Sequence, residues 1–263
     1  MLKVSFGIKI CAFKIGLVAS ALTIAPQISA RAADITFLCA GALETTVEEL
    51  LPEFQKATRH NVKATFAAIG VITQRLRKGD AADLATVSPQ QWDELQNEAK
   101  IDPAVRVVIA KVGVGVFVKK GAPKPDISSV DGFRSALVNA RSVALADPAG
   151  GGPVGAYSVR LFERLGITAE LSPKLKLVGG GLPPIEPVVK GEAEIGLTTI
   201  SEILQFPGVE LVGPLPGAIQ NFIVFTATIP ANAREPAAAK ALIDFLSSAK
   251  AISILKSKGL EQG

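Results

Sequence analysis

The stretch at 146–157, Ala-Asp-Pro-Ala-Gly-Gly-Gly-Pro-Val-Gly-Ala-Tyr, constrains the fold more than any other part of the chain. Residues 141–146 end in a short apolar run typical of a buried strand, and the residues after the loop follow a helical pattern that Gly166 can close. A glycine-rich loop between strand and helix lets backbone N–H groups approach a ligand, and the helix N-terminus adds partial positive charge. The stretch predicts an anion pocket; an ordinary glycine-rich connection is the alternative. The spacing is that of neither a P-loop nor a dinucleotide-binding loop.

The N-terminus has the pattern of a secretory leader. Lys3, Lys9 and Lys14 are followed by an apolar core at 15–24 and by Ala-Arg-Ala at 30–32. The apolar core is too short to span a bilayer as a helix, and the small residues are a cleavage signal. We expect residues 1–32 to be a signal peptide and the protein to work in the periplasm; a membrane anchor or a buried helix is the alternative.

Removing the leader changes the charge of the chain. The whole sequence has 28 Lys and Arg against 24 Asp and Glu. The leader holds four of the basic residues (Lys3, Lys9, Lys14 and Arg31) and no acidic one, so 24 of each sign remain in the mature chain. A net charge of zero gives no reason to expect a nucleic-acid partner.

The chain has few residues suited to nucleophilic catalysis or metal binding. Cys39 is the one cysteine outside the leader, in an apolar strand where a buried, inert thiol is expected. His60 is the single histidine and falls at a helix-to-strand junction. We therefore expect no catalytic residues, no metal and no cofactor, and we interpret the chain as a binding protein rather than an enzyme.

Strand and helix patterns alternate along the chain, which is typical of parallel sheets flanked by helices. Two long β-prone runs, at 105–118 and 221–228, interrupt this rhythm. We interpret them as strands that cross between two lobes. The first lobe is then expected at 33–112 and 220–263, and the second at 113–219, with a binding cleft between them.

Five segments occur in the order seen in periplasmic molybdate-binding proteins of ABC importers, and the mature chain resembles this family over nearly its whole length. The segments are Ile-Thr-Phe-Leu-Cys-Ala-Gly-Ala-Leu at 35–43, Ala-Asp-Leu-Ala at 82–85, Ala-Asp-Pro with Pro-Val-Gly-Ala-Tyr within 146–157, Leu-Ser-Pro-Lys-Leu at 171–175 and Val-Lys-Gly-Glu-Ala-Glu-Ile-Gly at 189–196. The resemblance implies a two-lobed α/β fold of the type II periplasmic binding protein class, with mainly parallel sheets flanked by helices and joined by two crossing strands. It also implies a monomer that passes a small anion to an ABC permease of the inner membrane.

The same resemblance implies where the ligand binds. Its positions in this chain are Gly41, Ala42, Ile69, Gly70, Val154, Gly181 and Thr199. Three of the family's side-chain donors are replaced: Ala42 stands for a serine, Ile69 or Gly70 for a serine cluster, and Thr199 for a tyrosine. Each hydrogen bond left unmade to a dehydrated oxyanion costs about 1–3 kcal/mol. We therefore expect a small anion other than molybdate, either an oxyanion or an organic carboxylate.

Further groups and functions stay open at this point. Thr45, Thr46, Thr198 and Ser201 are donors for a ligand or simply helix caps and turn residues. Arg75 either faces the cleft or is a solvated helix residue. A sensor or scaffold that has lost its transport role, and a cleft hydrolase, are the alternative functions.

Overall fold

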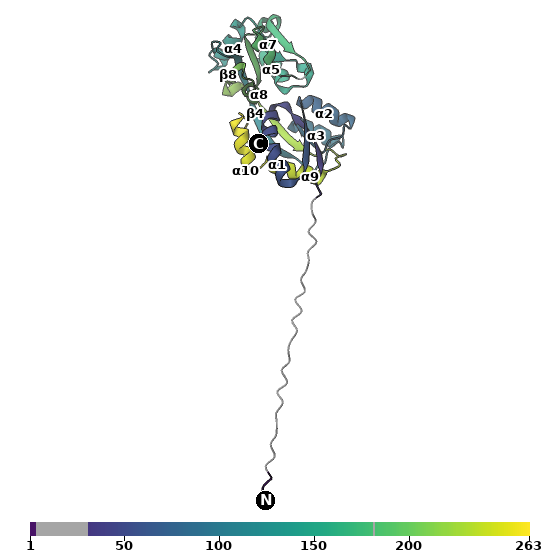
Figure 1. Cartoon of the computed structure of the whole chain (residues 1–263). Helices are drawn as coiled ribbons and strands as arrows, with labels where there is room; N and C mark the ends of the chain where they lie inside the picture. Colours follow the sequence, from purple (N-terminus) through teal and green to yellow (C-terminus); the bar gives the residue numbers. More distant parts are fainter. Residues whose placement is uncertain (4–30, 181) are drawn as a thin grey trace. The chain divides into compact units, whose positions relative to one another are not determined.

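The computed structural model describes residues 1–3, 31–180 and 182–263 (Figure 1). The predicted signal peptide lies almost wholly outside the described residues, and so does Gly181. The chain divides into a unit at 1–31 and a unit at 32–263, and the second holds every helix and strand of the described residues. None of the described helices is long and apolar enough to cross a membrane.

The second unit alternates strands and helices, as the sequence pattern predicts. Its strands are β1 (Asp34–Ala40), β2 (Asn61–Ala67), β3 (Leu84–Val87), β4 (Val107–Lys119), β5 (Val143–Ala146), β6 (Leu175–Val178), β7 (Ile195–Thr199), β8 (Val209–Pro214) and β9 (Phe222–Thr228). Its helices are α1 (Glu44–Thr58), α2 (Ile69–Lys78), α3 (Pro89–Asn97), α4 (Val130–Asn139), α5 (Pro153–Arg164), α6 (Thr168–Leu171), α7 (Ile185–Lys190), α8 (Ile200–Gln205), α9 (Pro236–Leu246) and α10 (Ala249–Ser257). Short 3-10 turns η1 (Gly41–Leu43), η2 (Pro148–Gly150), η3 (Ser172–Lys174) and η4 (Gly217–Ile219) complete it.

The strands follow the order β2-β1-β3-β9-β4-β7-β5-β6, with β8 beside β4. Parallel pairs lie at both ends of this order, β1 with β2 and β3, and β5 with β6 and β7. Strands β9 and β8 pair with β4 in antiparallel fashion. Figure 1 shows α1, α2, α3 and α9 around the first group of strands and α4, α5 and α7 around the second. The two-lobed α/β fold predicted from the sequence is confirmed.

Strand β4 belongs to both groups. Residues 107–113 pair with β9, whereas residues 114–119 pair with β7 and β8. The partner changes between Gly113 and Val114, which supports our proposal that the lobes divide at 33–112 with 220–263, and at 113–219. The return connection runs from β8 through η4 into β9, and the 3-10 turn within it was not predicted.

The side chain of Gln220 fixes this return connection to β4. Its Oε1 accepts the N–H of Val114 at 3.0 Å, and its Nε2 donates to the Val114 carbonyl at 3.1 Å. The amide thus adds a second partner to both groups of Val114, which also bond to the backbone of Asn221 and Leu215. Gln220 therefore extends the pairing of β4 where the chain passes between lobes.

Some element boundaries differ from the sequence expectation. The strand expected within 141–146 begins at Val143, and α7 begins at Ile185, after Pro183 and Pro184. Pro52 stays inside α1 and is exposed to solvent, so it neither delays nor ends that helix. Helix α8 was not predicted, because it follows β7 at once without a turn residue between them.

The Ala-Asp-Leu-Ala segment has a structural role. Asp83 is buried, and its carboxylate accepts backbone N–H bonds from Thr36 at 2.8 Å, Arg234 at 2.8 Å and Glu235 at 3.0 Å. These bonds join β1, the start of β3 and the segment that leads into α9. A buried carboxylate needs such partners to offset the loss of water.

Candidate functional site

A cavity of about 260 Å³ lies between the two lobes. The first lobe contributes the end of β1, the turn η1, the residues between β2 and α2, and two residues of β9. The second lobe contributes the glycine-rich loop and the start of α5, the end of β7, and α8 with the residue after it. The described wall is Ala40, Gly41, Ala42, Glu44, Phe66, Ala67, Ala68, Ile69, Ala146, Gly152, Pro153, Val154, Leu182, Pro183, Thr198, Thr199, Glu202, Gln205, Phe206, Ile223 and Phe225.

Most of the residues chosen from the sequence meet at this cavity. Gly41, Ala42, Ile69, Val154 and Thr199 all lie on its wall. The structure thus brings together segments far apart in the chain, but whether these residues bind a ligand stays a prediction.

The remaining two chosen residues differ. Gly70 is not on the wall, because its N–H donates to the carbonyl of Gly151 at 3.1 Å. Gly181 lies outside the described residues. Arg75 is off the wall as well; its Nε pairs with Asp80 at 2.8 Å, so it is a half-exposed helix residue.

The glycine-rich loop forms a tight passage from β5 to α5. Asp147 accepts the N–H of Ala149 at 2.9 Å and starts the turn η2, and Gly151 has a φ of 78°. Helix α5 then begins directly above the end of β5. A Cβ on Gly155 would lie 2.3 Å from the carbonyl oxygen of Ala146, so only glycine permits this approach. The approach places Val154, in the first turn of α5, on the cavity wall.

The first turns of two helices, one from each lobe, lie at the cavity wall. Ile69 is the first residue of α2 and Val154 the second residue of α5, and the first turns of helices have no intrahelical partners for their N–H groups. Both helix N-termini add partial positive charge where they meet the wall.

Two contacts hold the lobes together beside the cavity. The Gly70–Gly151 hydrogen bond joins α2 to the glycine-rich loop, and a Cβ on Gly70 would lie 2.7 Å from both the Cα and the carbonyl oxygen of Gly151. The hydroxyl of Ser201 donates to the carbonyl of Ala42 at 2.9 Å, so it joins α8 to η1. The structure therefore shows the lobes in contact around the cavity.

Two carboxyl groups on the wall were not predicted. Glu44 is the first residue of α1, and Glu202 lies in the first turn of α8. The hydroxyls of Thr198 and Thr199 both donate to Oε2 of Glu202, the latter at 2.9 Å, and Thr199 also caps α8. The signal available in the sequence was Thr-x-x-Glu at 199–202, a capping pattern that says nothing about a cavity.

The electrostatics of the wall are unusual for an anion site. No Lys, Arg or His side chain lies on the described wall. Burial, and then the charge of Glu48, raise the pKa of Glu44 above the usual range of a glutamate. The Nε2 of Gln205 is buried without a hydrogen-bond partner among the described residues, although the side chain lines the cavity.

Other groups considered from the sequence lie elsewhere. Thr45 and Thr46 are off the wall, and their buried hydroxyls have no partner among the described residues. Cys39 is buried, as predicted from the sequence, and burial raises the pKa of its thiol. His60 accepts the N–H of Ala33 on Nδ1 at 3.1 Å. Within the described residues no three His, Cys, Asp or Glu side chains gather into a possible metal site.

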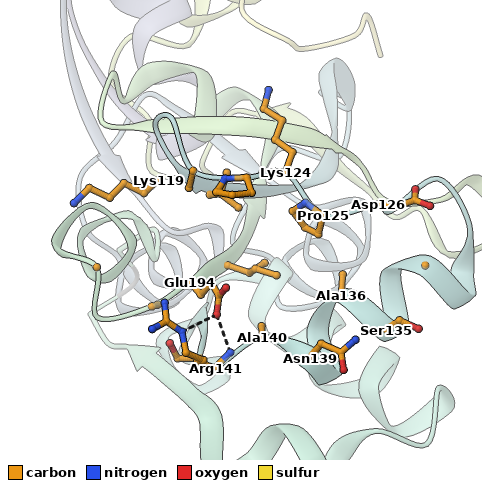
Figure 2. A pocket seen from close by; sticks show the side chains of 18 residues that line it. Lys119, Lys124, Pro125, Asp126, Ser135, Ala136, Asn139, Ala140, Arg141 and Glu194 are labelled. Atoms are coloured by element: carbon orange, nitrogen blue, oxygen red, sulfur yellow. Dashed lines mark hydrogen bonds and ion pairs between the residues drawn. The ribbon is translucent and has the colours of Figure 1, made fainter.

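A larger hollow, of about 820 Å³, lies within the second lobe beside α4 and the end of β4. Three of its charged groups are already in ion pairs: Arg141 pairs with Glu194 at 3.3 Å (Figure 2), and Lys124 pairs with Glu210 at 2.9 Å. The Arg141 side chain is 87% exposed. Residues from the first lobe take no part in it, so closure of the lobes cannot enclose a ligand there. We therefore regard the interlobe cavity as the candidate site.

Fold and cavity together define the class of a two-lobed extracellular binding protein. The chain belongs to the bacterial extracellular solute-binding proteins, whose family model matches residues 35–261. It is 30% identical to a Pseudomonas protein named aconitate isomerase, over 86% of this chain and 87% of that protein. It is 27% identical to the molybdate-binding protein ModA of Escherichia coli, over 86% and 88%. The periplasmic molybdate-binding protein of Azotobacter vinelandii superposes with a TM-score of 0.72 at 21% identity, covering 87% of this chain and 99% of that one. The resemblance to the molybdate-binding family is confirmed.

Proposed function

We propose that this chain is the periplasmic binding component of an ABC importer, and that its interlobe cavity binds a small organic polycarboxylate rather than molybdate. The observation that carries the proposal is the cavity wall. The cavity is larger than a tetrahedral oxyanion requires. Its wall is also more apolar and has fewer free hydroxyl groups than such a ligand needs.

Size is the first argument. A tetrahedral oxyanion has five heavy atoms, whereas this cavity of about 260 Å³ approaches the ~300 Å³ at which small-molecule pockets begin. The wall includes Phe66, Ile223 and Phe225, which suit the carbon skeleton of an organic acid. A bare oxyanion would gain nothing from these side chains.

The second argument is the supply of donors. The hydroxyls of Thr198 and Thr199 already donate to Glu202, so they are not free for a ligand. The first-turn N–H groups at Ile69 and Val154 and the unpaired Gln205 amide remain. These groups are spread around the wall, which suits several separate carboxylates better than one compact anion that needs donors on every side.

The relatives agree with this ligand class in part. One is named for aconitate, an unsaturated tricarboxylate, and others for molybdate. All of these ligands are anions, which fits the helix N-termini at the cavity. The replaced hydroxyls and the apolar wall favour the carboxylate.

Cellular location and partners form part of the same proposal. The basic, apolar and small-residue pattern of residues 1–32 supports export with a cleaved leader. Membership of the solute-binding family supports delivery of the ligand to an ABC permease. We propose that the mature chain acts as a monomer that closes on its ligand and docks to that permease.

Calorimetric titration of the mature protein tests the ligand. We expect cis- or trans-aconitate, or a saturated tricarboxylate, to bind at least 100-fold more tightly than molybdate or sulfate. That ratio corresponds to about 2.7 kcal/mol, or roughly two unmade hydrogen bonds. Submicromolar molybdate binding with no response to carboxylates would return the chain to ordinary molybdate transport. No response to any anion would favour a sensor or scaffold.

The affinity should also depend on pH through Glu44. In the free protein its raised pKa reflects burial and Glu48, and a bound anion raises that pKa further, so binding takes up a proton. Other titratable groups near it are Cys39 on β1 and, on the opposite lobe, Glu202. We therefore expect affinity to fall as pH rises through the Glu44 pKa, by at most about tenfold per pH unit for one proton.

Titrations between about pH 5.5 and 8, where a carboxylate ligand stays mostly ionised, measure this effect. Glu44→Gln should remove the slope while keeping tight binding, because glutamine is a permanently neutral donor. The exposed Glu192→Gln serves as the matched control and should keep the wild-type slope. An unchanged slope in Glu44→Gln would exclude Glu44 as the titrating group.

A further inference from the structure

Two carboxyl groups on the wall of an anion cavity need an explanation. Each has an ordinary structural role, because an acid in the first turn of a helix interacts favourably with the helix dipole. Glu44 does so in α1 and Glu202 in α8. Caps of this kind usually face solvent, however, and these two line a cavity with no basic side chain on its described wall. Negative charge there opposes anion binding unless a proton is present.

Glu202 is held in one orientation. Its Oε2 accepts the hydroxyls of Thr198 and Thr199, both at the end of β7. Its Oε1 takes part in no hydrogen bond with the described residues. One oxygen is therefore anchored and the other is left for the cavity, which is how a general base is positioned.

Glu44 differs from Glu202 in its surroundings. It comes from the opposite lobe, has no ion-pair partner among the described residues, and burial raises its pKa. Two hydroxyl groups donate to Glu202, whereas no hydroxyl group of the described residues donates to the Glu44 carboxyl. Two carboxyl groups that face one cavity from opposite lobes, one anchored by hydroxyl donors and the other without such partners, are suited to act as a base and an acid.

We infer that the cavity moves a proton between two carbons of a bound, unsaturated polycarboxylate, with Glu202 as the base and Glu44 as the acid. This inference rests on the proposed function, because the substrate is the ligand class proposed above. The predicted activity is an isomerisation, the reaction for which the 30% identical Pseudomonas relative is named, and the structure adds the assignment of Glu202 and Glu44 to it.

The reaction balances without a further reactant. Glu202 takes a proton from a CH₂ group that lies between a carboxylate and a carbon–carbon double bond. The electron pair of that C–H bond is shared over the three carbons and their carboxylates, near the helix N-termini of α2 and α5. Glu44 then gives its proton to the far carbon, so the double bond moves by one position. Proton exchange with water returns both glutamates to their starting states.

Proton NMR of the full mature protein with trans-aconitate, and separately cis-aconitate, in D₂O tests the inference. We expect conversion between the two, with deuterium entering the carbons at both ends of the three-carbon unit. Glu202→Gln should lower the rate at least 100-fold. A glutamine oxygen can still accept the two threonine hydroxyls, so the cap and the thermal midpoint should be kept. Its dissociation constant, measured by calorimetry, should not rise, since the change removes negative charge from the wall and a proton-transfer step contributes ~10²–10⁴-fold to rate rather than to binding.

The outcomes separate the two proposals. If wild type binds aconitate but neither converts it nor exchanges deuterium, catalysis is overturned and the binding function stands. If wild type neither binds nor converts it, both proposals fall for this ligand class. Full activity in Glu202→Gln would overturn the role of Glu202, and full activity in Glu44→Gln that of Glu44. Glu192→Gln is the control and should match wild type, because Glu192 is exposed outside the cavity.

Discussion

Gly155→Ala should destabilise the protein by about 2 kcal/mol and weaken anion binding at least tenfold. The added Cβ would lie 2.3 Å from the Ala146 carbonyl oxygen, a backbone atom that cannot rotate away. Overpacking usually costs ~1–3 kcal/mol, and contact with backbone puts this site at the upper end. The better helix propensity of alanine, about 1 kcal/mol, offsets part of it. Relief requires α5 to move away from β5, which takes the Val154 N–H from the cavity and loses one hydrogen bond.

Urea unfolding and calorimetric titration of the variant measure the two effects. Gly217→Ala is a suitable control, because a Cβ at Gly217 meets nothing within 4 Å. We expect the control to change stability by less than about 0.5 kcal/mol, as surface substitutions usually do. Wild-type stability in Gly155→Ala would mean that α5 does not pack against β5 as closely as the structure shows. If stability falls but affinity is unchanged, the Val154 N–H does not contribute to ligand binding.

Much of this fold could be predicted from the sequence because local patterns and packing agree. Continuous apolar runs identified the buried strands, and the length of the run at 105–118 identified β4 as the strand shared by both lobes. The Ala-Asp-Leu-Ala segment marked the family, but the reason for it is Asp83, whose three backbone partners lie up to 152 residues away from it in the chain. A pattern in the sequence can mark such a residue without showing what it binds.

The site could be predicted only in part. The loops that form the wall follow strands, and the resemblance to molybdate-binding proteins located Gly41, Ala42, Ile69, Val154 and Thr199 on them. Glu44 and Glu202 were missed because each occupies a favourable capping position, which hides any second role. To tell a helix cap from a cavity residue, one must know which face of the helix meets the opposite lobe. The sequence of one segment does not contain that information.

The two carboxyl groups also change the view of the replaced hydroxyl groups. Thr199 stands where the family has a tyrosine, and its hydroxyl orients Glu202 rather than facing a ligand. A tyrosine here would therefore remove one of the two hydroxyl donors of Glu202 and the side-chain cap of α8.

Gly70→Ala should weaken ligand binding by about 30- to 100-fold while leaving the free protein as stable as wild type. In the structure a Cβ on Gly70 would lie 2.7 Å from the Cα and carbonyl oxygen of Gly151, and it would break the hydrogen bond between these residues. The contact joins the two lobes, so the clash arises only when they close. The overpacking then makes closure of the lobes less favourable by ~2–3 kcal/mol. Because the ligand binds to the closed lobes, its affinity falls by the same free energy.

Small-angle scattering and calorimetry with the tightest ligand of the panel measure this effect. Wild type should contract on binding, whereas Gly70→Ala should need about 30- to 100-fold more ligand for the same contraction. Gly217→Ala, which adds the same methyl group in open space, should behave as wild type. Gly151 is a poorer test, because its φ of 78° would strain any other residue even in separated lobes. Wild-type affinity in Gly70→Ala would show that the ligand-bound lobes do not meet at these two glycines, and the closed cavity would then have a different shape.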